Sequence, residues 1–173
     1  MKKFIICICT IIASCFSVKA QNNAQANLNV QLNTIQSIRI NEGQSDVTIA
    51  LNTADEYING KSSSLQDHIE IMSSSDYEIK VSASSNLVGD AASIDIGTVS
   101  IIPSLGSIGE STQGALNLSP INLSLADNTI VQSSQGDSKR SFNIEYHVSG
   151  GEEYLNKPTG SYNTLITYTI IAP

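Results

Sequence analysis

The sequence has no Trp, only three Cys and only two His among its 173 residues. The three Cys, at positions 7, 9 and 15, all lie within the first twenty residues, so the rest of the chain contains neither a disulfide nor a thiolate centre. Acidic residues outnumber Lys and Arg by 16 to 9. This acidic balance argues against binding to nucleic acid or to an anionic membrane surface.

The first twenty residues have the layout of a secretory signal peptide. Lys2 and Lys3 precede an apolar run over 4–16, and Val18-Lys19-Ala20 supplies small residues for cleavage before Gln21. The apolar run is shorter than the roughly 20 residues that span a bilayer, and no later run approaches that length. We therefore expect residues 1–20 to be removed and the mature chain to have no membrane span.

A second interpretation of the same region is a lipobox. Ile12-Ala13-Ser14-Cys15 resembles the motif in which the Cys becomes the acylated first residue of a membrane-tethered protein. Phe16 is an unusual residue after a lipidated Cys, and the cleavage site at Ala20 would then have no role. Cleavage without a lipid anchor at Cys15 is the favoured interpretation. It predicts an exported protein at the cell surface or in a fimbrium, otherwise in the periplasm or secreted.

Apolar and polar residues alternate with a period of two in many segments after residue 21, whereas no long stretch keeps a helical period. The clearest run is 141–149, where Phe142, Ile144, Tyr146 and Val148 share one face. The segment 76–84 repeats this pattern. Further strands are predicted at 26–32, 37–40, 47–51, 68–72, 94–102, 121–125, 129–132 and 162–171.

About ten short strands, separated by turns rich in Gly, Asn and Ser, predict a single all-β domain over 21–173. We expect an antiparallel two-sheet sandwich of immunoglobulin-like character. The Gly- and Ser-rich stretch 103–114 is expected to be a long loop. Nothing in the pattern predicts a second domain.

Groups that carry chemistry are sparse. Both His68 and His147 alternate with apolar neighbours, so both are expected on solvent-facing sides of strands. The adjacent Asp67 and His68 are expected to face opposite ways, which excludes the carboxylate–imidazole contact of a nucleophilic triad. The ligands for zinc, the spacing of a calcium loop and the aromatic cleft of a glycosidase are all missing. We expect no enzyme activity, no metal and no cofactor.

The segment after the predicted cleavage site alternates strictly. Its five apolar residues are separated by Gln and Asn, and they are Ala24, Ala26, Leu28, Val30 and Leu32. One interpretation is the first strand of the sandwich, paired within its own chain. The other is a strand that adds to the open sheet edge of another subunit, with backbone hydrogen bonds and with side chains in pockets.

The C-terminus has a matching pattern. Ile166, Tyr168, Ile170 and Ala172 alternate to the end of the chain, and Gly160 is the fourteenth residue from that end. Together the two ends resemble the chaperone-usher pilus subunits. In that family an immunoglobulin-like sandwich lacks its last strand, a periplasmic chaperone lends one, and the N-terminal extension of the next subunit later replaces it.

This resemblance implies a role for each end. The alternating residues 24–32 would be the donor strand, the residues Ile166, Tyr168, Ile170 and Ala172 would line the acceptor edge, and Gly160 would occupy the family's glycine position. The partners would be other subunits, identical or related, and a periplasmic chaperone. Two features depart from the family: Ala172 stands where pilins usually carry an aromatic residue, and the frequent disulfide is absent.

A second resemblance concerns the last strand only. Residues 162–173 are similar to the final strand of WxL cell-surface domains, with Tyr168 at the place of the defining Trp. The expected function is a secreted, non-enzymatic structural or adhesive subunit of the cell surface that assembles by strand exchange. The alternative is a monomeric envelope domain that binds wall polymer or a surface protein through its loops.

Overall fold

The computed structural model of the protein describes residues 23–109 and 116–173. The chain divides into two units, residues 1–32 and 33–173, and each is described by itself. The expected signal peptide over 1–20, the cleavage site and Cys15 lie outside the described residues.

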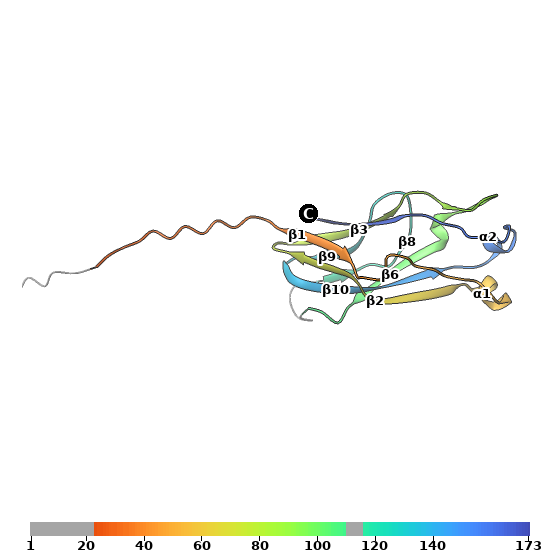
Figure 1. Cartoon of the computed structure of the whole chain (residues 1–173), viewed down its shortest axis with the longest axis horizontal. Coiled ribbons are helices and arrows are strands. Elements are labelled where there is room, and N and C mark those ends of the chain that lie inside the picture. Colours follow the sequence, from red (N-terminus) through yellow and green to blue (C-terminus); the bar gives the residue numbers. More distant parts are fainter. Residues whose placement is uncertain (1–22, 110–115) are drawn as a thin grey trace, which may run out of the picture. The chain divides into compact units, whose positions relative to one another are not determined.

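Residues 33–173 form an antiparallel all-β sandwich, as the alternation predicts (Figure 1). Sheet A has the order β1-β2-β10-β6-β8, with β1 Gln36–Ile40, β2 Lys61–Ser73, β10 Asp137–Val148, β6 Val99–Leu105 and β8 Ile121–Asn122. Sheet B has the order β11-β3-β9-β7, with β11 Ile166–Ile171, β3 Tyr77–Ala83, β9 Asn128–Ser133 and β7 Leu116–Leu118. The remaining elements are short: β4 Leu87–Val88 paired with β5 Ser93–Ile94, the helices α1 Ala54–Asn59 and α2 Glu152–Leu155, and the 3₁₀ turn η1 Ile96–Thr98.

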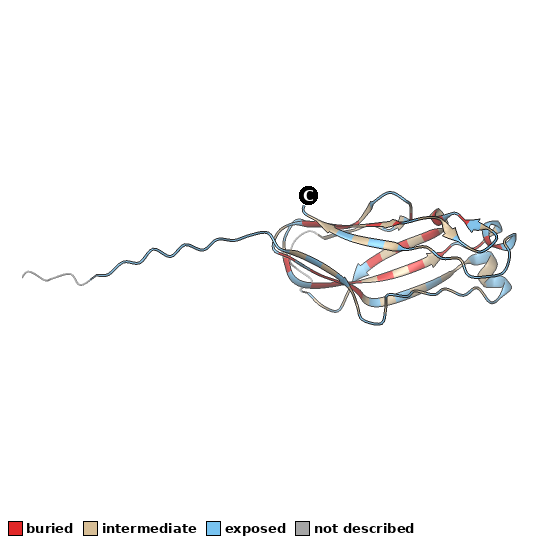
Figure 2. Cartoon of the chain, turned by 45° about the horizontal axis from the view of Figure 1, so that its top comes forward, coloured by how far each residue is buried: buried red, intermediate tan, exposed pale blue. Residues whose placement is uncertain are grey.

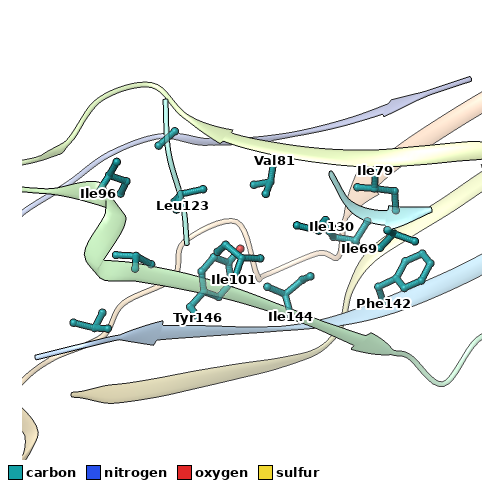
Figure 3. Close-up of a cluster of buried hydrophobic side chains, with 14 of the residues drawn as sticks. Ile69, Ile79, Val81, Ile96, Ile101, Leu123, Ile130, Phe142, Ile144 and Tyr146 are labelled. Carbon is teal, nitrogen blue, oxygen red and sulfur yellow. The ribbon is translucent and has the colours of Figure 1, made fainter. Parts of the chain in front are cut away.

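The core lies between the two sheets, because each strand buries alternate side chains on its inner face. Figure 3 shows side chains from β2, β3, β6, β9 and β10 meeting in this layer. Ile69, Ile79, Ile101, Ile130 and Phe142 are fully buried there. Along β3 and β10 the burial alternates almost residue by residue, and Figure 2 shows the same banding along the strands. Burial of one face therefore explains why apolar residues recur at every second position of these strands.

One end of the sandwich holds a buried polar cluster. The Arg140 guanidinium lies 2.8 Å from the Asp137 carboxylate, and the Tyr77 hydroxyl donates to the same carboxylate over 2.7 Å. All three side chains are buried. Burial and the Asp137 charge raise the pKa of Tyr77 far above its usual value, so the phenol stays protonated and acts as a donor.

Several predicted elements differ from the structure. No strand forms over 26–32 or over 47–51. The predicted strand 94–102 is divided into β5, η1 and β6, because the Asp95 carboxylate accepts from the Gly97 N–H over 2.7 Å and turns the chain there. Helix α1 is not indicated by the hydrophobic period; Thr53 and Glu56 form a capping box at its start.

Candidate functional site: a groove at the edges of the two sheets

A groove of about 470 Å³ lies within the unit 33–173, between the segment 47–51 on one side and residues 158–166 on the other. Buried side chains from several elements form its floor: Ile94, Ile96, Val99, Tyr146, Val148 and Tyr154. Lys157 is the only charged residue among those that line it. A concave surface with a buried apolar floor, polar uncharged walls and one cation suits a ligand that has both apolar and polar groups and few charges.

The first wall of the groove is the segment 47–51. Val47, Ile49 and Leu51 are half-buried, while the residues between them are exposed, so the predicted alternation of faces is present. The predicted strand is nevertheless wrong: within the described chain, no backbone group of 47–51 is hydrogen-bonded to another backbone group. The Ala50 carbonyl accepts from two side chains, the Lys61 ammonium over 2.9 Å and the Asn52 amide over 3.3 Å. The wall therefore offers unused strand-forming groups.

The second wall leads into the edge strand of sheet B. Among the described strands, β11 pairs with β3 alone, so its other side is an unpaired edge. Gly160 and Ile166 line the groove. Tyr168 and Ile170 are half-buried against the core farther along β11. Ala172 is exposed and lies beyond the end of β11. Of the five predicted C-terminal residues, the other four therefore lie in the groove wall or in β11, and Ala172 lies in neither.

A chain of hydrogen bonds lies beside this groove. The His68 Nε2 is 2.8 Å from the Tyr146 hydroxyl, which is 2.7 Å from the Tyr168 hydroxyl. On the other side of the imidazole, Nδ1 is 3.0 Å from the Gln44 Oε1. These bonds join β2, β10, β11 and the turn that precedes the segment 47–51. Burial lowers the pKa of His68 and raises the pKa of Tyr146 to about 12.

The expectation that His68 faces solvent is wrong, since its side chain is only 2% exposed. The cause is local. Asp67 has a positive φ of 50°, and the pairing of β2 with β10 shifts register over this stretch, so the period of two is interrupted and His68 turns inward. The Asp67 carboxylate instead accepts from the Ser107 N–H and hydroxyl, both over 2.6 Å. The two neighbours therefore contact different partners, as the triad argument expects.

The second His behaves as predicted. His147 is partly exposed, and its Nδ1 lies 3.0 Å from the Ser62 hydroxyl across the β10–β2 pair. Among the described residues, no group of three or more His, Cys, Asp or Glu side chains is arranged to hold a metal ion. Nor does the described part of the chain contain a helix long and apolar enough to cross a membrane.

The N-terminal segment is described from residue 23. Residues 23–32 have no regular secondary structure, and every one of them is exposed (Figure 2). Leu28 and Leu32 are each 89% exposed, and Val30 is 68% exposed. The segment contains no charged residue. It is thus an extended segment of alternating apolar and polar residues whose apolar side chains are exposed in the described part of the chain.

Several groove residues have no local signal in the sequence. Tyr57, Leu87 and Tyr154 come from α1, β4 and α2, which the folded chain brings to one place. Compared with known proteins, the chain matches no family model. No curated protein matches it either.

Proposed function

We propose that this protein is an exported structural subunit of a fimbria-like surface assembly, and that its subunits join by strand exchange. In this assembly, residues 24–32 of one copy lie in the groove of the next copy. They run between the segment 47–51 and the open edge of β11. The observation that carries the proposal is a groove with a buried apolar floor, flanked by backbone groups that no strand of the described chain pairs.

The chemistry of the segment matches that of the groove. An incoming strand forms backbone hydrogen bonds with an open sheet edge and places alternate side chains into pockets. Leu28, Val30 and Leu32 supply large apolar side chains at this spacing, and the Asn and Gln between them supply the outer face. Neither partner presents a carboxylate that burial would leave unpaired.

The segment is long enough to cover the whole edge of β11. Nine residues in a strand cover about 30 Å, whereas the six residues of β11 cover about 20 Å at roughly 3.3 Å per residue. Burying each large apolar side chain contributes roughly 1.5–3 kcal/mol before the cost of ordering the segment. Three such residues and two Ala therefore support a stable contact. A periplasmic chaperone that lends a strand to the same edge would protect the groove until assembly.

The test uses a synthetic peptide of residues 23–35 and the purified chain. Calorimetry is expected to show binding, and amide hydrogen exchange is expected to show new protection at residues 47–51 and in β11. A matched peptide with Leu28→Asp is expected to bind at least tenfold more weakly. The proposal is wrong if neither peptide binds and the chain remains a monomer at concentrations that should drive assembly.

A further inference from the structure

The hydrogen-bond chain through His68 has a fixed direction. The Gln44 Oε1 can only accept, so the imidazole proton is on Nδ1. Nε2 must then accept from the Tyr146 hydroxyl, and the Tyr146 oxygen accepts from the Tyr168 hydroxyl. The amide nitrogen of Gln44 donates to the Gln66 carbonyl over 3.0 Å, which sets the orientation of the Gln44 amide. Each of these three hydrogen bonds therefore has one donor and one acceptor only while His68 is neutral.

These bonds connect the groove floor with neighbouring parts of the sandwich. Tyr168 belongs to β11, the edge strand of the second wall, and Tyr146 belongs to the groove floor. Gln44 lies three residues before the first wall begins. The three aromatic rings also pack edge to face, with ring centroids 5.6 Å apart for His68–Tyr146 and 6.0 Å apart for His68–Tyr168.

No anionic partner faces the imidazole among the described residues. The titratable groups in contact with it are the two phenols, Tyr146 from β10 and Tyr168 from β11. The other charged groups of the surrounding strands have their own partners or face away. On β2, Asp67 binds Ser107, and Glu70 pairs with Arg39 and Lys139. On β10, Glu145 binds Ser64, and His147 binds Ser62. On β3, Glu78 pairs with Lys80. Near Gln44, both Glu42 and Asp46 are exposed, and β11 contains no charged residue.

We propose that protonation of His68 releases β11 from this hydrogen-bond chain and opens the groove, so that strand binding and release respond to pH. This inference rests on the proposed function and adds a mode of regulation to the same site. An imidazolium donates from both nitrogens, so Tyr146 must turn its proton toward Tyr168. The Tyr168 hydroxyl then loses its acceptor, and a positive charge is buried without a carboxylate.

The direction of the pH effect follows from burial. The folded, closed state holds the pKa of His68 below its usual value, whereas an open state restores a value of about 6.5. The open state therefore binds more protons below about pH 6.5. The ratio of closed to open groove is expected to fall by up to about tenfold per pH unit, until the pKa of the closed state is reached.

Amide hydrogen exchange of the full purified chain tests this inference directly. Exchange is measured between pH 7.5 and pH 5 and corrected for the intrinsic rate at each pH. The amides of β11 are expected to lose protection on acidification, while those of β6, which lies between β10 and β8 in sheet A, keep theirs. His68→Gln, which retains a donor and an acceptor without titrating, is expected to remove this response. His147→Gln, which changes the partly exposed His, is the matched control and is expected to behave as the wild type.

Tyr168→Phe serves as a second variant, because it keeps the aromatic ring but removes the hydrogen bond between β11 and the Tyr146 hydroxyl. Its β11 amides are expected to exchange faster at neutral pH and to respond less to acid. The inference is overturned if β11 and β6 lose protection in parallel, or if His68→Gln retains the wild-type response. Binding of the 23–35 peptide at pH 7.5 and pH 5.5 is a separate measurement: no binding at either pH contradicts the strand-exchange proposal, whereas equal binding at both contradicts its regulation.

Discussion

Replacing Leu28 by Asp perturbs the proposed assembly without touching the folded core. Leu28 is 89% exposed in the described chain, so the variant loses no internal packing and is expected to keep the stability of the wild type. On binding, the change removes roughly 1.5–3 kcal/mol of apolar burial and adds the cost of desolvating a carboxylate in a groove whose only charged lining residue is Lys157. Since about 1.4 kcal/mol is tenfold in affinity, binding is expected to weaken by about tenfold to several hundredfold or more.

Sedimentation of the mature chain over a range of concentrations measures this effect. The wild type is expected to form oligomers, and Leu28→Asp is expected to sediment as a monomer with an unchanged unfolding transition. Asn29→Asp adds the same charge on the other face of the segment and serves as the matched control, with assembly close to that of the wild type. Equal assembly by Leu28→Asp and the wild type, or equal impairment by Asn29→Asp, would refute the argument that this face enters a groove.

Two further predictions concern the stability of the sandwich. Asp137→Ala removes the carboxylate beside the buried Arg140, and urea unfolding is expected to show that the free energy of unfolding falls by about 3–5 kcal/mol. The control Asp90→Ala, on the surface, is expected to lower it by under about 0.5 kcal/mol. A loss below about 1 kcal/mol for Asp137→Ala would contradict the role of that pair. Hydrogen bonds from Ser107 and Ser141 lower the pKa of Asp67, so its contribution to the free energy of unfolding is present above about pH 4 and is lost as the pH falls through the folded-state pKa. Asp67→Asn is therefore expected to be less stable than the wild type at pH 7 and to approach it in acid; a pH-independent difference would show that the carboxylate charge is not involved.

The all-β fold is predictable from the sequence because one-sided burial imposes a period of two on each strand. The segments 76–84 and 141–149 correspond to β3 and β10, whose inner faces are buried throughout. The same pattern fails at 26–32 and 47–51. Alternation shows which face is apolar, but it does not show whether a neighbouring strand is present to complete the ladder.

Other features escape sequence analysis for different reasons. The inward turn of His68 depends on the positive φ of Asp67, a single backbone conformation that no hydrophobic period records. Helix α1 has a signal that the period misses, namely Thr53 followed three residues later by Glu56. The groove itself is assembled from segments more than 100 residues apart, so only the folded chain shows that Leu51 and Ile166 share one cavity.

Cysteine cross-linking between two copies tests the central claim most directly. The sequence has no Cys after position 15, so introduced thiols are unique in a chain that starts at residue 21. One variant carries Leu28→Cys and the other carries Ile49→Cys, in the wall of the groove. Mixing them under mild oxidation is predicted to give a dimer in which peptide mapping finds position 28 joined to position 49, and Asn29→Cys is predicted to give none. Absence of this link between copies, together with its formation inside a single chain that carries both substitutions, would show that the segment folds back on its own domain and would contradict assembly by strand exchange.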